Sequence, residues 1–201
     1  MVYISLIIAM FFLCIYIREV RKVKFDVNLT IIIGIFSAMA FCLNSIKFIR
    51  MPQGGSISLF SMVPVMIIAV LKGNATGLTS GILLGFLKML DGITFINPLQ
   101  FVLDYILANM CFGFSGIFGK NNKFKIILGC TLSGMLCILF NILSGALFFG
   151  EFAPEGTNVW IYSIIYNFSS IGIEIILSII LMFFIPIKKL DKVINKNLKV
   201  N

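Results

Sequence analysis

The sequence predicts an all-α membrane protein, a polytopic bundle of transmembrane helices. Of its 201 residues, 60% are hydrophobic and 12% are charged, whereas soluble domains average about 45–50% apolar and roughly 25% charged residues. The apolar residues gather in long runs, and the sequence lacks the period-two alternation of a membrane β-barrel. Because lipid offers no hydrogen-bond partner to an open backbone, these runs are expected to cross the bilayer as helices.

Seven apolar runs are long enough, or nearly long enough, to cross a hydrocarbon layer of about 30 Å. They cover residues 2–17, 28–46, 57–71, 75–90, 98–118, 124–149 and 159–187. The first run lacks the flanks of a signal peptide, so we expect it to remain as a helix. The chain then divides into an extra N-terminal transmembrane helix with a basic linker (1–27), a six-helix membrane domain (28–187) and a basic tail (188–201).

The positions of the basic residues predict the orientation of the chain. Its net charge is +8, which in a soluble protein would suggest nucleic acid, but here the charges lie between apolar runs. Alternate connections and the tail hold Arg18, Arg21, Lys22, Lys24, Lys72, Lys120, Lys123, Lys125, Lys188, Lys189, Lys192, Lys196 and Lys199. Lys47 and Arg50 lie on the other side. The positive-inside rule predicts an external N terminus, a cytoplasmic C terminus and contact of the basic side with lipid.

One carboxylate, Asp104, lies inside an apolar run, in the stretch QFVLDYILANMCFGFSG (100–116). At 100° per residue, a narrow helical stripe joins Asp104 to Ala108, Cys111 and Ser115, all of which are small or polar. Asp104 is therefore expected to face the protein interior. An ionised aspartate near the centre of a membrane helix is unfavourable by about 2.5–3.5 kcal/mol, so a partner or a function is required.

The sequence leaves several partners open for Asp104. Lys88 could form a structural ion pair with it, and so could Lys47 or Arg50 at the outer mouth. A bound cationic ligand could neutralise it instead, or the carboxyl group could be protonated and hydrogen-bonded.

Two later runs carry polar or small side chains along one helical face. The stripe in the last run consists of Trp160, Ser163, Asn167, Ser170, Glu174 and Ser178. Tyr162 and Tyr166 flank this stripe, and the preceding run has a ridge of Asn141, Gly145 and Phe149. We expect a structural hydrogen bond for Glu174, which lies deepest. These stripes predict a cavity open to the exterior, near Trp160, that suits a small, flat organic cation.

Catalytic and metal-binding patterns are missing from the sequence. It contains no histidine, no G-x-x-x-x-G-K-[ST] phosphate loop and no H-E-x-x-H motif, and its cysteines form no C-x-x-C pair. We therefore expect no catalytic residue, no metal site and no cofactor. A membrane enzyme that uses Asp104 and Glu174 as acid and base remains the alternative from another class.

Small residues at four-residue spacing form two ridges. Gly73, Gly77, Gly81 and Gly85 lie on one run, where close packing within the bundle is expected. Gly34, Ala38 and Cys42 repeat the pattern on residues 28–46, where a partner helix could dock.

Three stretches resemble a known family, the thiamine-specific substrate-binding subunits (S components) of energy-coupling-factor (ECF) vitamin transporters. They are MPQGGSISLFSMVP (51–64), NPLQFVLDY (97–105) and NILSGALFFGEFAPEGTNVWIYSIIYN (141–167), and the resemblance extends from about 28 to 187. It implies a six-helix core that binds thiamine near its outer face without catalysis. It also implies docking to a transmembrane coupling subunit and two ATPase subunits, with Gly34 and Ala38 as the docking patch.

The resemblance also implies residue roles. Asp104 and Tyr105 match the acid and tyrosine at the thiazolium, while Tyr162 and Asn167 match the residues that hold the pyrimidine. The complete expected ligand-binding set is Asp104, Tyr105, Asn141, Gly145, Phe149, Tyr162, Tyr166 and Asn167. Phe149 and Asn141 depart from a tryptophan and a histidine in the family pattern. These departures keep open a different vitamin or a thiamine precursor such as a hydroxymethylpyrimidine; a stand-alone secondary carrier is a further alternative.

Overall fold

The computed structural model describes residues 2–51, 55–92 and 94–198 of the chain. Pro52–Gly54 of the first family stretch lie outside the described residues, as do Ile93 and the end of the basic tail with Lys199. The side chain of Lys196 also lies outside the described part.

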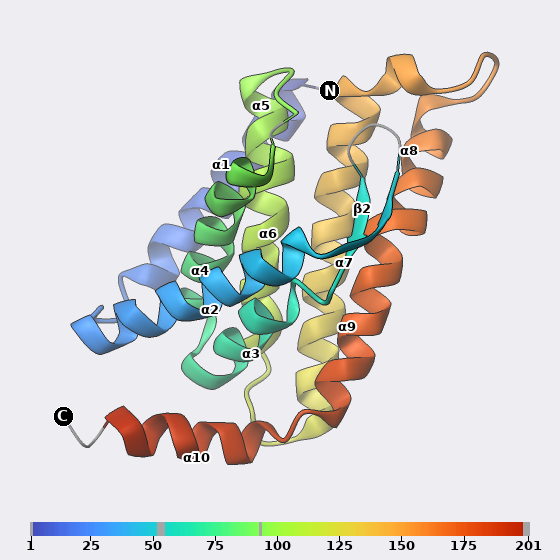
Figure 1. Ribbon diagram of the computed structural model, residues 1–201. Helices are drawn as coiled ribbons and strands as arrows, with labels where there is room; N and C mark the ends of the chain where they lie inside the picture. Colours follow the sequence, from blue (N-terminus) through green and yellow to red (C-terminus); the bar gives the residue numbers. More distant parts are fainter. Residues whose placement is uncertain (1, 52–54, 93, 199–201) are drawn as a thin grey trace.

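The described chain is a bundle of helices with a short antiparallel hairpin on one side (Figure 1). Its elements are α1 (Val2–Val20), α2 (Val27–Ser45), β1 (Lys47–Arg50), β2 (Ser56–Ser58), α3 (Val63–Lys72), α4 (Asn74–Leu87), η2 (Lys88–Asp91), α5 (Pro98–Phe101), η3 (Val102–Leu107), α6 (Ala108–Met110), η4 (Cys111–Gly116), α7 (Lys123–Phe148), η5 (Gly150–Phe152), α8 (Val159–Asn167), η6 (Phe168–Gly172), α9 (Ile173–Phe184) and α10 (Ile187–Leu198). The predicted all-α membrane bundle is confirmed, with the hairpin as an addition.

Four helical segments within the described residues are long and apolar enough to cross a membrane. They are α1, α2, α7 and the continuous segment formed by α8, η6 and α9. The shorter α3 and α4 pack against each other, and residues 98–116 combine α-helical, π-helical and 3₁₀ turns. The predicted apolar runs thus recur in the same order, although several are shorter or less regular than a continuous α-helix.

Polar side chains fix where several helices begin. Asp26, Asn97, Asn122 and Asn158 each accept a hydrogen bond from a backbone N–H in the first turn of α2, α5, α7 and α8 respectively. Such caps satisfy amides that have no partner within the helix. The cap at Asn97 therefore sets the register of the segment that carries Asp104.

The helix α1 packs on the bundle through one aromatic patch. The ring of Phe12 meets Phe140 edge-to-face at a centroid distance of 5.0 Å and Phe114 at 6.1 Å. The hydroxyl of Tyr16 lies 3.3 Å from the hydroxyl of Thr79 on α4. Side-chain contacts thus attach α1 to the rest of the described bundle.

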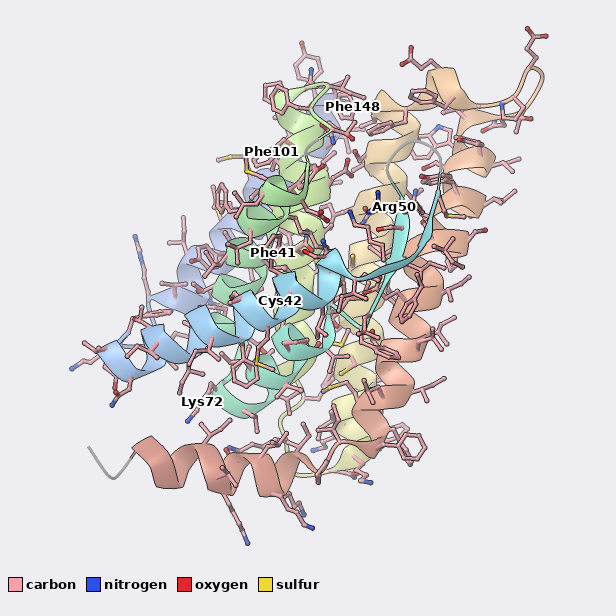
Figure 2. The ribbon with its side chains drawn as sticks, in the orientation of Figure 1. Phe41, Cys42, Arg50, Lys72, Phe101 and Phe148 are labelled. Atoms are coloured by element: carbon pink, nitrogen blue, oxygen red, sulfur yellow. The ribbon has the colours of Figure 1, made fainter. Side chains whose placement is uncertain are left out.

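Two segments differ from the expected run boundaries. Residues 57–62 were expected to begin a membrane helix, but β2 and a turn occupy them, and α3 begins at Val63. β2 pairs with β1, with Ile57 opposite Ile49. At the other end, the basic tail forms α10, which lies across the end of the bundle (Figure 1), and Figure 2 shows Lys72 at this same end. Ile187 of α10 is buried against the core.

The glycine ridge packs α4 against residues 98–116. A Cβ atom on Gly77 would overlap Gly113 and Ala69, and one on Gly85 would overlap the carbonyl of Tyr105. Gly73 does not belong to this ridge, contrary to the sequence pattern. Its φ of 92° places it in the left-handed region, where it joins α3 to α4.

Replacing Gly81 by alanine is expected to destabilise the protein. A Cβ atom there would overlap the backbone carbonyl of Asn109, which cannot rotate away. We expect the free energy of unfolding to fall by about 1–3 kcal/mol, as in other overpacked cores. Thermal unfolding in detergent would measure the change, with Gly34→Ala as the matched control because a Cβ at Gly34 meets no atom within 4 Å. Equal melting temperatures for the two variants would contradict the packing role.

Candidate functional site

A cavity of about 230 Å³ lies between the hairpin, η2, η3, α7 and the α8–η6–α9 segment. All eight residues of the expected ligand-binding set line it: Asp104, Tyr105, Asn141, Gly145, Phe149, Tyr162, Tyr166 and Asn167. Residues more than 60 positions apart in the sequence are therefore brought to one site. Their role in ligand binding remains a prediction.

Asp104 lies on the π-helical turn η3 and is held by a neighbour one turn earlier. The side-chain amide of Gln100 donates a hydrogen bond of 2.8 Å to the Asp104 carboxylate. Gln100 is 1% exposed, and its amide oxygen accepts from the backbone N–H of Ile96. This chain of bonds orients the carboxylate toward the cavity that it lines.

None of the ion pairs considered for Asp104 forms among the described residues. Lys47 instead pairs with Asp91 at 2.6 Å. Lys88 lines the cavity but makes no ion pair within 4.0 Å in the described part of the chain, and Arg50 is an exposed residue of β1. The cavity carboxylate is thus left without a cationic partner from the described chain.

The opposite wall of the cavity is built by α7 and α8, which approach closely at Gly145. A Cβ atom on Gly145 would overlap the hydroxyl of Ser163. The side-chain amide of Asn167 donates to the carbonyls of Ser163 and Asn141 at 2.9 and 3.3 Å, and that of Asn141 donates to Cys137 at 2.8 Å. Among the described residues, no hydrogen bond occupies the side-chain oxygen of either asparagine. These two oxygens can accept hydrogen bonds from a ligand.

Aromatic rings complete the walls. Tyr105 stacks on Phe101 at a centroid distance of 5.4 Å, and its hydroxyl accepts from the backbone N–H of Thr94 at 3.1 Å. Phe149 follows the end of α7. The ring centroids of Tyr162 and Tyr166 on α8 lie 6.0 Å apart. Figure 2 shows Phe101 and Phe148 near the end of the bundle opposite α10. Aromatic faces attract organic cations by about 0.5–2 kcal/mol each.

Trp160 does not line the cavity, whereas Tyr162 and Ser163 of the same helix do, and its place at the mouth stays a prediction. It lies in the first turn of α8 and is 38% exposed. The helical stripe continues to point inward below it, with Ser163, Ser170 and Ser178 all buried.

The hairpin is fastened to the α8–α9 segment at two points. The hydroxyl of Tyr166 accepts a hydrogen bond of 2.9 Å from the backbone N–H of Gly55, where a Cβ atom would overlap that hydroxyl. Deeper in the bundle, Glu174 accepts four hydrogen bonds: from the backbone N–H and the hydroxyl of Ser58, and from the same two groups of Ser61. The structural role expected for Glu174 agrees with these bonds.

Several contacts of the cavity residues were not predicted from the sequence. Gln100 precedes Asp104 by four residues, and this spacing places both side chains on one helical face. The hydrogen bond between them could therefore have been predicted from the sequence. Ser58 and Ser61 lie in the first family stretch, yet their link to Glu174 spans more than 110 residues. No local pattern indicates such a contact.

These features define a multi-pass helical membrane protein with a polar, aromatic-lined cavity large enough for a small organic molecule. Residues 29–194 match the family model described as Thiamine transporter protein. The chain belongs to this family, which confirms the resemblance drawn from the three stretches. The matched region begins after α1.

Individual relatives agree with the family match. The thiamine transporter ThiT of Bacillus subtilis is 39% identical over 150 residues, which cover 67% of this chain and 78% of the relative. ThiT of Lacticaseibacillus paracasei is 29% identical over 140 residues, covering 61% and 69% respectively. A solved structure of ThiT from Listeria monocytogenes superposes with a TM-score of 0.70 at 27% identity, covering 83% of this chain and 96% of that one.

Proposed function

We propose that this protein binds thiamine in the cavity and serves as the substrate-binding subunit of a thiamine uptake system. The observation that carries the proposal is Asp104, a carboxylate that lines the cavity without a cationic partner among the described residues. Thiamine contains a permanently charged thiazolium ring joined to an aminopyrimidine. Its positive charge would neutralise Asp104 away from bulk water, where such interactions are strong.

The two walls of the cavity suit the two ends of thiamine. On the first wall, Asp104 and Tyr105 would meet the thiazolium. On the second, Tyr162 would flank the pyrimidine while the side-chain oxygens of Asn167 and Asn141 accept from its amino group. Phe149 and Tyr166 supply further ring faces, and Gly145 keeps the space between α7 and α8 open. The names of the relatives, which are thiamine transporters, support the same ligand.

Transport would depend on other chains. The ridge of Gly34 and Ala38 on α2 faces outward: Ala38 is exposed, and a Cβ on Gly34 would meet no atom within 4 Å. A transmembrane coupling subunit could approach α2 closely there, with two ATPase subunits supplying energy. In this proposal the N terminus is external, the C terminus is cytoplasmic, and the subunit performs no catalysis of its own.

Calorimetric titration of the purified protein tests the ligand. We expect thiamine to release heat and saturate one site at micromolar concentration. The neutral hydroxymethylpyrimidine should bind at least about 10-fold more weakly, because it lacks the charge that Asp104 attracts. Absence of thiamine binding would reject the proposal. Equal affinity for the neutral pyrimidine would favour the precursor as ligand, the alternative suggested by Phe149 and Asn141.

A further inference from the structure

Lys88 is a cation in the cavity wall whose hydrogen-bonding capacity is unused within the described protein. It lies at the start of η2 and lines the cavity together with Asp104. No hydrogen bond and no ion pair within 4.0 Å joins its ammonium group to another described residue. Lys88 is half-buried, and an ammonium group with three donors in such a place favours a ligand that offers an acceptor, because a poorly solvated donor without a partner is unfavourable.

The acidic groups near Lys88 already bind other residues. The charged and titratable neighbours of Lys88 are Glu174 and Cys137, then Lys47 and Asp91. Glu174 accepts four hydrogen bonds from Ser58 and Ser61. Asp91 pairs with Lys47 at 2.6 Å. The donors of Lys88 therefore remain available to a molecule inside the cavity.

Lys88 lines the same cavity as Asp104, and both groups are electrostatic neighbours of Cys137. Lys88 follows α4 directly, and α4 packs so tightly on the Asp104 segment that a Cβ on Gly85 would overlap the carbonyl of Tyr105. Asn141 and Asn167 belong to α7 and α8 on the opposite wall. Lys88 and Asp104 line one cavity and both lie near Cys137, so a ligand that meets Asp104 can present a substituent to Lys88.

We infer that Lys88 donates a hydrogen bond to an oxygen on the side chain of the ligand's cationic ring. This inference rests on the proposed function, in which the thiazolium lies at Asp104. Thiamine carries a hydroxyethyl chain on that ring, and its hydroxyl oxygen is a suitable acceptor. The site then selects ligands with a positively charged ring that faces Asp104 and an oxygen-bearing substituent on that ring that faces Lys88.

A double-mutant cycle between protein and ligand tests this contact. Wild type and Lys88→Met are each titrated by calorimetry with thiamine and with deoxythiamine, in which hydrogen replaces the hydroxyl group. We expect Lys88→Met to weaken thiamine binding by about 10- to 100-fold, the range for a hydrogen bond from a charged group. Deoxythiamine should bind wild type more weakly than thiamine does. Lys88→Met should change the affinity for deoxythiamine by less than about twofold.

The alternative is that Lys88 acts through Glu174 as a structural charge. In that case Lys88→Met would weaken the binding of both ligands equally, which would overturn the inference.

Lys125→Met, which removes an exposed lysine at the start of α7, is the matched control and should bind both ligands like wild type. If Lys88→Met fails to fold, the two ligands still distinguish the cases in wild type: equal affinities overturn the contact. Failure of wild type to bind thiamine would instead reject the proposed function.

Discussion

Replacing Asp104 by asparagine is expected to lower the affinity for thiamine by about 100-fold or more. Removing one partner of a desolvated charge pair typically reduces binding free energy by about 2–5 kcal/mol. Asparagine keeps the size of the side chain and can still bond to Gln100, so the fold should persist. Calorimetry with thiamine on purified wild type and variant would measure the difference.

The matched control for this result is Glu155→Gln, which neutralises an exposed carboxylate in the connection between α7 and α8. It should leave thiamine affinity within about twofold of wild type, since exposed charges interact weakly through water. Undiminished affinity in Asp104→Asn would show that this carboxylate is not the counter-ion of the ligand.

Replacing Glu174 by leucine is expected to cause the largest loss of stability. Leucine fits the volume but accepts no hydrogen bond, so the four donors of Ser58 and Ser61 would lose their acceptor. A buried donor without a partner is unfavourable by about 1–3 kcal/mol, so the free energy of unfolding should fall by about 3 kcal/mol or more. The melting temperature in detergent should drop by about 6 °C or more.

Glu174→Gln provides the comparison, because glutamine retains one side-chain oxygen as acceptor. Its loss of stability should be smaller than that of the leucine variant. Hydrogen exchange at the backbone amides of Ser58 and Ser61 should rise in both variants, and most in Glu174→Leu. A leucine variant that melts like wild type would contradict the anchoring role of Glu174.

The helical membrane bundle and the inward direction of Asp104 could be predicted because both depend on local periodicity. Run length and the absence of charge identify helices in lipid, and a rotation of 100° per residue tells which side chains share a face. The same rule placed Asn141, Gly145 and Asn167 on inward faces. Spatial clustering of the eight residues then followed from the family resemblance and from the shared polarity of the stripes.

Contacts between distant segments could not be predicted in this way. Lys88 was considered as a partner of Asp104, but its neighbours come from α7, α9, β1 and η2. The β1–β2 hairpin contains few apolar residues in alternation, and its pairing depends on Glu174 and Tyr166 far along the chain. The left-handed φ of Gly73 likewise escaped detection, because its four-residue spacing matches the packing ridge.

The hydrogen bonds that Ser58 and Ser61 donate to Glu174 also constrain the order of assembly during synthesis. The serines leave the ribosome more than 110 residues before their acceptor, and at about 5–20 residues per second this delay lasts several seconds or more. Until the last membrane segment inserts, the hairpin lacks its hydrogen bonds to Tyr166 and Glu174, and the cavity lacks the wall that this segment forms. Nascent chains truncated before residue 174 should therefore expose the hairpin to added protease, whereas the completed chain protects it.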